Sequence, residues 1–508
     1  MARVPLTIGP QTRELLAALD EFFRERGVAA YVTGGFLRDA LLARASRDVD
    51  LSIDGDPLEA GPALADAMRG SYFALSEEQA IVRIVAPELG AQVDLLPLRG
   101  EIENDLRRRD FTIDAMAASL TEAASGKATV IDPTGGRDDL RRRLVRAVSE
   151  EAFRQDPLRP LRGARLAVEL EFTIEAATTE LIRTYAANLP EAAAERQRDE
   201  LMRILATDRA GEGMRLLDDL RLLEVILPEM TGSRGVEQPK EHHWDVFGHL
   251  LAAVGNLDML LGEREPSDEP QRELWRALWT GVAWWEGARG YFREQMIVER
   301  PRSAVLKLAA LLHDIGKPET KTFEESGRMR FFGHADVGAD KAAAILRRLR
   351  FSSREVSLVR AMVKAHLRPV QMGQQGPPTR RAVYRYFRDC GDDAGMLTLF
   401  LSLADHLATV GPRVDIEGWR QHVALVNYIL AKRLQEEETI MPPRLLGGDE
   451  LMTELDLSPG PLIGRFLETI AEAQAAGDIA TREDALELAR SLLARRRTAR
   501  SASGSDQA

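Results

Sequence analysis

The apolar residues of this chain change their spacing near residue 148, and this change restricts the possible folds more than any other feature. Before it, residues 10–27 have the spacing of an amphipathic helix, whereas residues 27–35, 48–53 and 80–98 have the short runs or the alternation of strands. After it, nearly every apolar pattern has helical spacing. The sequence therefore predicts the α+β class, with a mixed head followed by an all-α body.

The length of 508 residues allows about three domains. Segments with Pro and Gly at 228–240, near 376 and at 441–448 indicate breaks between helical regions. The small, polar residues 497–508 are predicted to be disordered. The predicted division is a head, a helical neck, a second helical domain and a helical tail, at residues 1–148, 149–235, 236–440 and 441–508.

Composition excludes several classes of protein. No apolar run approaches the roughly 18 residues of a membrane span, and the first residues lack the basic-then-apolar order of a signal peptide. Cys390 is the single cysteine, which excludes an internal disulfide framework and a cysteine-based zinc site. The net charge of −12 argues against a basic surface built for DNA. We therefore expect a cytoplasmic protein whose partners include neither a membrane nor DNA.

Two carboxylates in the head are candidates for catalysis. Asp48 and Asp50 stand two apart in a predicted strand, so both side chains face the same side of the sheet. Paired carboxylates are hard oxygen ligands of the kind that Mg²⁺ prefers together with water and phosphate. Two such metals can stabilise both the attacking and the leaving oxygen of a displacement at phosphorus. A solvated surface pair without a metal is the alternative.

The residues around this pair favour a phosphate site. Gly34 and Gly35 end the preceding strand and let a backbone approach a triphosphate closely, although two glycines also make an ordinary turn. Asp94, on a later predicted strand, is a third candidate carboxylate. Further candidates for phosphate and ribose contacts are Arg38, on the helix after the glycines, and three residues ahead of a predicted apolar helix, Arg108, Arg109 and Asp110.

These segments resemble the motifs of class II tRNA nucleotidyltransferases and the related bacterial poly(A) polymerases. The similarity rests on YVTGGFLRDALL and RDVDLSI, on RRDFTIDAMA, on IDPTGGRDDLRRRLVRAV and on FRQDPLRPLRGARLAVELEFTIEAAT, in the family's order over about residues 25–210. Two positions depart from the family pattern, with Gln155 in place of Glu and Asp114 in place of Asn. Both departures bear on which nucleotides are added.

The resemblance implies a polymerase-β-like head that binds Mg²⁺ through Asp48 and Asp50. It implies that an RNA 3′-hydroxyl attacks the α-phosphate of a nucleoside triphosphate and expels pyrophosphate. The implied triphosphate contacts are Gly34, Gly35 and Arg38, and the implied ribose contacts are Arg109 and Asp110.

In this family, side chains of a neck helix read the incoming base. The resemblance assigns this role to Asp156 and Arg159, which a helix would place on one face because they are three positions apart. These groups would meet the Watson–Crick edge of ATP or CTP, and a plain helical salt bridge is the alternative. Arg162 and Arg165 are included among the nucleotide-binding candidates. Residues 195–205 match the next helical motif and are expected to brace the neck.

Every histidine of the chain follows residue 241, so a histidine metal site would lie in the second half. His313 and Asp314 end an apolar helix, where a polar doublet is difficult to justify as core. Imidazole and carboxylate together suit Mn, Fe, Co, Ni or Zn better than Mg. The candidate ligands are His249, His313, Asp314, His334, His366 and Asp405.

HDIGK followed by FFGHADVGADKA resembles the HD phosphohydrolase superfamily. The resemblance implies one metal held by His249, His313, Asp314 and Asp405, a second completed by His334 and His366, and a phosphate contact from Lys317. A helical scaffold without chemistry is the alternative. The remaining histidines are interpreted as linker residues (His242 and His243) or as satisfied helix residues (His406 and His422).

An aromatic insertion lies between His249 and His313. It carries four tryptophans that we expect to pack in the core or at an interface, with stacking of RNA bases as the alternative. They are Trp275, Trp279, Trp284 and Trp285.

Three functions remain open from sequence. The first is Mg²⁺-dependent addition of C, A or both to the 3′ end of tRNA from CTP and ATP, or poly(A) synthesis by the same chemistry. The second is a metal-dependent phosphohydrolase that acts on RNA 2′,3′-cyclic phosphates or nucleotides. The third is a non-catalytic RNA-binding protein, against which the retained carboxylates and histidines argue.

Overall fold

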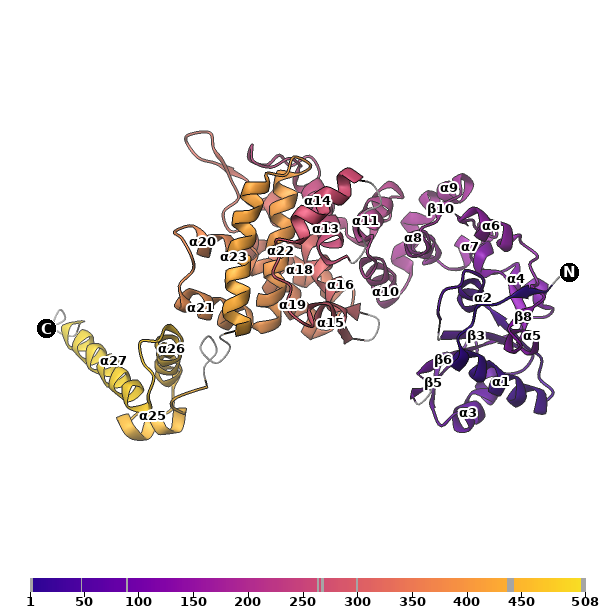
Figure 1. Cartoon of the computed structure of the whole chain (residues 1–508), viewed down its shortest axis with the longest axis horizontal. Helices are drawn as coiled ribbons and strands as arrows, with labels where there is room; N and C mark the ends of the chain where they lie inside the picture. Colours follow the sequence, from indigo (N-terminus) through magenta and orange to yellow (C-terminus); the bar gives the residue numbers. More distant parts are fainter. Residues whose placement is uncertain are drawn as a thin grey trace. The chain divides into compact units, whose positions relative to one another are not determined.

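The computed structural model describes residues 3–46, 48–87, 90–262, 265, 269–297, 300–435 and 443–503. The chain forms two compact units (Figure 1). The first consists of Met1–Ile204 with Arg215–Ile226, and the second of Leu205–Met214 with Leu227–Ala508. Within the described residues, no helix combines the length and apolar character that a membrane crossing requires.

A six-stranded sheet forms the centre of the first unit. Only β3 and β6 run parallel among its neighbouring pairs, and the other pairs are antiparallel. The strand order is β4 (Ser71–Ser76), β5 (Ile81–Ala86), β6 (Ala91–Pro97), β3 (Asp48–Ile53), β2 (Ala30–Thr33) and β7 (Ala117–Ser119). The predicted α+β class is confirmed, and the strands around residues 30, 50 and 90 lie where the sequence predicts them.

The two faces of this sheet differ in chemistry because side chains alternate along each strand. One face is fully buried and consists of apolar side chains such as Val49, Leu51, Val82, Ile84 and Val93. Each of these contributes about 1.5–3 kcal/mol on burial. The other face carries the polar members of the same strands. Burial of the apolar face therefore fixes how neighbouring strands are aligned, and this alignment decides which polar side chains lie next to one another on the other face.

Helices accompany the strands of this unit. Helix α3 packs against β4, β5 and β6, and α1 packs against α5. Their bounds are α1 Pro10–Glu25, α2 Gly34–Leu41, α3 Pro57–Ala67, α4 Ile102–Leu106, α5 Leu120–Ala124 and α6 Gly136–Arg142.

Two features of the head differ from the sequence-based expectation. The apolar helix expected after Asp110 is a single 3₁₀ turn, Thr112–Asp114, followed by strand β7. Pairing with β2 and a hydrogen bond from Ala117 N to Ile131 O at 3.0 Å override the helical spacing in this buried segment. Strand β4, which no sequence pattern indicated, is a sheet edge whose residues are almost all exposed.

The neck is helical, as predicted, except for the short strand β10 (Thr173–Ile174), which pairs with β9 (Leu144–Val145). Arg165 is enclosed by Glu169 on its own helix and by Glu200 on α10, which ties these two helices together. The helices are α7 Glu150–Gln155, α8 Arg159–Leu170, α9 Ala176–Tyr185, α10 Ala194–Leu205 and α12 Leu223–Ile226. Helix α11 (Ala210–Asp219) contributes residues to both units.

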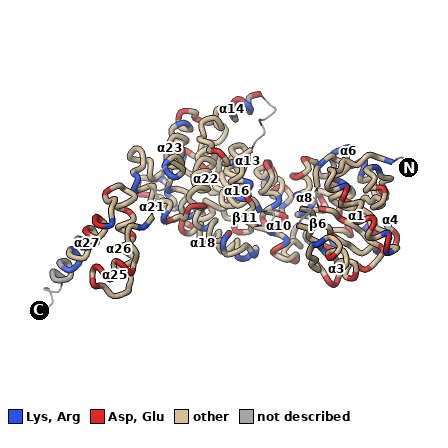
Figure 2. The backbone as a smooth tube through the Cα atoms, turned by 60° about the horizontal axis from the view of Figure 1, so that its bottom comes forward, with Lys and Arg blue, Asp and Glu red and all other residues tan. Residues whose placement is uncertain are grey.

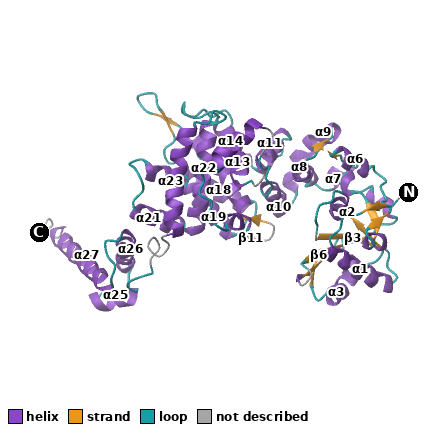
Figure 3. Ribbon diagram, viewed as in Figure 1, coloured by secondary structure: helices purple, strands orange, loops and turns teal. Residues whose placement is uncertain are grey.

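The second unit is built from helices packed around α22 (Asp392–Val410), which is buried along most of its length. Helices α13 (Val246–Leu261), α16 (Arg302–Leu312) and α19 (Ser353–Ala365) pack against it, and α18 (His334–Arg348) packs against α19. Basic and acidic residues are interspersed along these helices (Figure 2). Within the described residues, the predicted all-helical body has two small exceptions (Figure 3). They are the pair of β11 (Gln295–Ile297) with β12 (Arg300–Pro301) and the pair of β13 (Thr322–Phe323) with β14 (Met329–Arg330).

The remaining helices of this unit complete its body and tail. The body includes α14 Glu269–Trp279, α15 Ala288–Arg293, α17 Lys317–Thr320, α20 Arg368–Gly373, α21 Arg380–Cys390 and α23 Ile416–Gln435. The tail consists of α25 Gly448–Leu455, α26 Pro461–Ala476 and α27 Arg482–Ser503. The tail helices share their own apolar cluster around Leu451 and Phe466, and α26 also packs against α21.

The chain end expected to be disordered differs in part from that expectation. Helix α27 continues through Ser503, so the first residues of the segment 497–508 are helical. Residues 504–508 lie outside the described part of the chain, as do residues 441 and 442 of the predicted third break.

Candidate active site and metal centre

The three carboxylates predicted in the head lie on one face of the sheet. Asp50 of β3 is the register partner of Asp94 on the parallel strand β6. Asp48 lies two residues before Asp50 on the same face and is exposed. The sheet therefore brings together three acidic groups from segments more than 40 positions apart.

Gly34 closes over Asp50. The φ of Gly34 is +61°, and a Cβ at this position would lie 3.0 Å from Asp50 Oδ2 and 3.2 Å from Arg109 Nη1. Any other residue would therefore be strained and would also crowd the carboxylate. The Phe36 N–H donates to Asp50 Oδ2 at 3.4 Å. Burial and the neighbouring Asp94 raise the pKa of Asp50 to about 6. These acidic oxygens fit a cation, because a positive charge between them relieves their repulsion.

Arg83, which the sequence analysis did not single out, holds Asp94. Its Nε and Nη2 donate to Asp94 Oδ1 and Oδ2, both at 2.8 Å. The two residues are register partners on the antiparallel strands β5 and β6. A cross-strand pair of this kind is predictable from the hairpin around Gly90 once its register is known.

Arg109 lies beside the glycine turn. Its Nη2 donates to Thr33 Oγ1 and Ser52 Oγ, both at 3.1 Å, and to Asp105 Oδ2 at 3.4 Å. The guanidinium is therefore held next to Gly34, at the end of β2.

Arg38 is more enclosed than a triphosphate contact requires. Its Nη1 donates to Asp114 Oδ1 at 2.7 Å, and its Nε donates to Asp39 Oδ1 at 3.0 Å. The side chain is buried, so two carboxylates already engage it. Asp114, one of the two departures from the family pattern, is thus a partner of Arg38 in this structure. Arg108 is exposed.

Asp110 and Arg162 connect the head to α8. The Arg162 Nε lies 3.3 Å from Asp110 Oδ2, and the Phe111 N–H donates to Asp110 Oδ1 at 2.9 Å. Burial disfavours the charged form of Asp110, but Arg162 and Arg159 outweigh burial and lower the pKa of this carboxyl. The charged form of Asp110 is therefore the stable one.

The predicted helical face shared by Asp156 and Arg159 is wrong. Helix α7 ends at Gln155, Asp156 has extended backbone angles, and α8 begins at Arg159. Pro157 explains the break, because proline disfavours helical angles in the residue before it. Asp156 instead accepts hydrogen bonds from Arg196 of α10 at 3.2 and 2.6 Å. The Arg159 Nη1 donates to Ala152 O at 2.9 Å.

The six candidate ligands of the second unit lie together, although five helical segments supply them. His249 is on α13, His313 and Asp314 follow α16, His334 begins α18, His366 follows α19, and Asp405 is on α22. Gly316 makes this convergence possible, because a Cβ there would lie 2.3 Å from His334 O.

The ligand atoms form two groups that share Asp314. The Asp314 Oδ2 lies 3.3 Å from both His249 Nε2 and His313 Nε2, and Asp405 Oδ1 lies 3.0 Å from His249 Nε2. The Asp314 Oδ1 lies 3.2 Å from His334 Nε2 and 3.5 Å from His366 Nε2. Each carboxylate oxygen of Asp314 therefore faces a different pair of histidines.

Backbone carbonyls fix the orientation of three of the histidines. The Nδ1 atoms of His313, His334 and His366 lie 2.8, 2.7 and 2.6 Å from the carbonyls of Ala310, Phe331 and Val363. A carbonyl only accepts, so each Nδ1 carries the hydrogen, and each ring, when it is neutral, presents an Nε2 lone pair to the centre.

The donor set fits a metal ion. His249 Nε2 and His313 Nε2 lie 3.1 Å apart, and Asp314 Oδ1 is buried without a hydrogen-bond partner among the described residues. Burial lowers the pKa of His249 and His366, whereas Asp314 and Asp405 outweigh burial at His313 and raise its pKa to about 10. Imidazole nitrogen and carboxylate oxygen at this spacing suit a divalent metal.

Lys317 and His242 border this centre. Lys317 Nζ lies 2.6 Å from Asp314 Oδ2 and donates to Gln238 Oε1 at 2.7 Å. The His242 ring lies 5.7 Å from the His249 ring, so His242 is part of the surroundings of the centre and not a remote linker residue. Its spacing from His249 gave no indication of this in the sequence.

The tryptophans pack against neighbouring rings as expected, but His406 is not the satisfied helix residue expected from sequence, because its Nε2 is buried without a hydrogen-bond partner among the described residues. The rings of His406 and His422 stack 4.7 Å apart, and His422 Nε2 lies 3.0 Å from Ser402 O. Trp275, Trp279 and Trp284 stack on one another at 5.4 and 5.5 Å, so their faces are occupied by each other.

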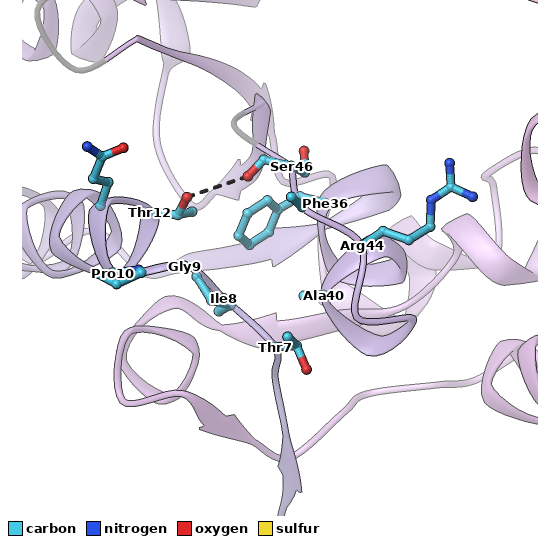
Figure 4. Close-up of a pocket in the computed structure, with 11 residues that line it drawn as sticks. Thr7, Ile8, Gly9, Pro10, Thr12, Phe36, Ala40, Arg44 and Ser46 are labelled. Carbon is cyan, nitrogen blue, oxygen red and sulfur yellow. Dashed lines mark hydrogen bonds between the residues drawn. The ribbon is translucent and has the colours of Figure 1, made fainter. Parts of the chain in front are cut away.

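A cavity of about 440 Å³ lies in the head, between residues 7–12 at the start of α1 and residues 36–46 on and after α2 (Figure 4). The Phe36 ring points into it, and Thr12 Oγ1 donates to Ser46 O at 3.5 Å on its wall. Ser46 also bonds the backbone of Asp48, with its Oγ 3.2 Å from Asp48 O. Ser46 thus links the cavity wall to the start of β3, a contact that no sequence pattern indicated.

Three protein-family models match the chain. "Poly A polymerase head domain" matches residues 30–99 and 90–146, and "Probable RNA and SrmB-binding site of polymerase A" matches residues 171–233. "HD domain" matches residues 286–409, which include every candidate ligand of the second unit except His249.

Two curated proteins are similar over nearly their whole length. The A-adding tRNA nucleotidyltransferase of Deinococcus radiodurans is 37% identical over 462 residues, covering 90% of this chain and 94% of that protein. The CC-adding tRNA nucleotidyltransferase of Thermus thermophilus is 36% identical over 463 residues, covering 90% and 92%. Among solved structures, the Thermotoga maritima CCA-adding enzyme complexed with tRNA shares the fold, with a TM-score of 0.57, 19% identity and coverage of 97% and 100%.

Proposed function

The chain belongs to the tRNA nucleotidyltransferase family, and we propose that it adds C residues, A residues or both to the 3′ end of tRNA, with CTP and ATP as substrates. Support comes from relatives with A-adding and CC-adding activity in their names that align over about nine-tenths of the chain. Poly(A) synthesis by the same chemistry is the alternative within the family.

One observation carries this proposal: Asp48, Asp50 and Asp94 share one face of the sheet beside the Gly34 turn. We propose that Asp48 and Asp50 hold Mg²⁺, which would lower the pKa of the attacking hydroxyl and neutralise phosphate charge. In the reaction, a bond forms between the RNA 3′-oxygen and the α-phosphorus. The bond from that phosphorus to the β-phosphate bridging oxygen breaks, and pyrophosphate leaves.

The neighbouring side chains would bind and orient the nucleotide. The turn at Gly34 and Gly35 leaves the backbone accessible, and Arg109 beside it carries the positive charge that a triphosphate requires. Arg108 is exposed and available to the same substrate. We assign Arg38 to a bracing role in place of a direct triphosphate contact, because Asp39 and Asp114 engage it.

The neck residues would supply base and ribose contacts. We propose that Asp156 and Arg159 read the base from the break between α7 and α8. Asp156 must then exchange Arg196 for the base edge. Asp110 with Arg162 is proposed to face the ribose, whereas Arg165 braces α8 against α10.

The test is incorporation into tRNA transcripts that lack CCA, that end in C or that end in CC, with each labelled nucleoside triphosphate alone and with all four together. Addition of C and then A indicates a complete enzyme, and addition to only one transcript indicates a partial one. Long A tails would support the poly(A) alternative. The absence of any incorporation with Mg²⁺ would contradict the proposal.

A second activity is favoured by a separate observation, the two ligand groups that share Asp314. We propose that this centre binds Mn, Fe, Co, Ni or Zn and hydrolyses a phosphoester, a 2′,3′-cyclic phosphate or a phosphomonoester. The bound metals would supply a nucleophilic hydroxide. Lys317, held between Asp314 and Gln238, would contact the phosphate once substrate displaces one of these partners.

Metal analysis of the purified protein tests the second activity, together with release of phosphate or of a 2′- or 3′-phosphate from adenosine 2′,3′-cyclic phosphate. Protein without bound transition metal, and without cleavage in Mn²⁺, Ni²⁺ or Co²⁺, would reduce this domain to a scaffold.

We also propose that the protein acts in the cytoplasm. The division of the chain into domains at residues 148, 235 and 440 stays a prediction.

A further inference from the structure

The metal centre of the second unit opens on one side. Four of its ligand side chains are at most 2% exposed, namely His249, His313, Asp314 and His366. The His334 and Asp405 side chains are 9% and 20% exposed. A substrate therefore approaches past His334 and Asp405.

A hairpin with exposed aromatic side chains leads directly to His334. Its strands are β13 (Thr322–Phe323) and β14 (Met329–Arg330), which pair antiparallel. In Figure 3 they are the unlabelled orange strands of the second unit that lie away from the labelled strand β11. Phe323 is 63% exposed, and Phe332, two residues before His334, is 72% exposed. Exposed aromatic rings at the entrance to a site indicate a binding surface.

Basic groups accompany these rings. The Arg330 guanidinium lies 5.9 Å from the Phe332 ring centre, and the Lys321 ammonium lies 5.8 Å from that of Phe323. Lys317, which contacts Asp314, lies 5.5 Å from the ring of Phe331. Aromatic and cationic groups thus continue from the hairpin to the shared metal ligand.

A second exposed aromatic residue, Trp244, is linked to the centre through Gln238, which donates to Trp244 O at 3.2 Å and accepts from Lys317. Trp244 is 38% exposed, five positions before His249, and its ring contacts that of His243 at 4.5 Å. The His243 N–H donates to Thr409 O at 2.9 Å, which fixes this segment to the helix that carries Asp405. The other large hydrophobic residues exposed in the described part of this unit, Val370 and Leu434, are aliphatic.

We propose that Phe323, Phe332 and Trp244 form a nucleobase-binding rim of this centre, so that its substrate is a nucleotide or an RNA end and not a small phosphoester without a base. The proposal rests on the phosphohydrolase activity proposed above. Aromatic rings stack bases of any sequence, and flanking cations attract the phosphates. The base would stack on the rim while the phosphate reaches Asp314 and Lys317.

The experiment compares two cyclic esters that differ in the presence of a base, adenosine 2′,3′-cyclic phosphate and glycerol 1,2-cyclic phosphate. Phe332→Ala and Phe323→Ala should lower kcat/KM for the nucleotide about tenfold, mainly through KM, and leave the glycerol ester unchanged. Phe332→Trp, which keeps an aromatic ring at this position, should retain the wild-type kcat/KM for the nucleotide. Phe73→Ala, an exposed aromatic residue of the head, is the matched control. Equal losses for both esters, or no loss for either, would overturn the proposal.

A binding measurement separates this proposal from the proposed hydrolysis. Stacking quenches the fluorescence of 2-aminopurine riboside 3′-phosphate, which is added to wild-type protein loaded with Zn²⁺ and to Phe332→Ala. Quenching by the wild type alone supports the rim even if no ester is cleaved, in which case only the hydrolysis proposal fails. Equal quenching by both proteins contradicts the rim even if cleavage occurs.

Discussion

The two acidic centres of this chain hold their carboxylates in opposite ways. In the head, Asp48 is exposed and Asp50 is only partly covered, on the open face of a sheet. In the second unit, Asp314 and three of the histidines around it are almost completely buried, and backbone carbonyls orient three of the rings. An open carboxylate pair suits a cation that arrives with the nucleotide, whereas an enclosed set of oriented imidazoles suits a resident metal.

The largest expected effect is on the open centre. Asp48→Asn and Asp50→Asn should each lower nucleotide addition by about a hundredfold or more, because each would remove a proposed cation ligand. The melting temperature should not fall, since a neutral amide at position 50 would no longer repel Asp94. The measurement is single-turnover addition to a tRNA transcript. Asp54→Asn, on the exposed turn after β3, is the control and should keep full activity. Addition by either variant at more than a few per cent of the wild-type rate would contradict the metal assignment.

The enclosed centre is expected to be independent of the head. His313→Ala combined with Asp314→Ala should abolish metal content and phosphoester hydrolysis and change nucleotide addition by no more than about twofold. The pair also leaves the buried Lys317 without its carboxylate, which costs about 3–5 kcal/mol in comparable cases. His334→Gln removes one candidate ligand from the group formed by Asp314, His334 and His366, and it leaves Lys317 paired with Asp314.

Metal content, hydrolysis and addition are therefore measured for both variants, with circular dichroism to show which are folded. Loss of addition by folded His334→Gln would mean that the two centres are coupled, and the contrast drawn above would be wrong.

The next effect concerns the choice of base. Asp156→Ala should raise misincorporation of G and U about ten- to hundredfold, because a bidentate contact to a base edge contributes about 1–3 kcal/mol of discrimination. Single-turnover selectivity among the four nucleotides is the measurement. Arg196→Met is the matched control, since it removes the same ion pair from the other side. If both variants retain selectivity, Asp156 is only a salt bridge of the neck.

Sequence reasoning succeeded where residues carry a local signature. The strand that holds Asp48 and Asp50, the glycine turn before it and the apolar helix that ends at His313 lie where their spacing predicts them. Each of these features depends on alternation, on helical spacing or on a turn residue, and these act within about ten positions.

The remainder depends on contacts between distant segments. The Arg83–Asp94 pair follows from strand register, and the engagement of Arg38 by Asp114 spans 76 positions. The position of His242 beside His249 depends on how a loop folds back. The break at Asp156 is the exception, because Pro157 was visible in the sequence and should have excluded a helical Asp156.

The smallest expected effect is a pH dependence that separates the two centres. Burial and Asp94 raise the pKa of Asp50 to about 6, so this group is charged above that pH and takes up a proton as the pH falls through it. A proton and Mg²⁺ compete for the same oxygens, so well below pH 6 the apparent affinity for the cation should fall about tenfold per pH unit. Titration of Mn²⁺ by electron paramagnetic resonance between pH 5 and 8 reports the head alone when it is done on the His313→Ala, Asp314→Ala protein, once circular dichroism has shown that this protein is folded. Asp94→Asn removes a neighbouring negative charge and should move the midpoint to lower pH. A cation affinity that is flat down to pH 5 would show that Asp50 is not the ligand whose protonation limits binding.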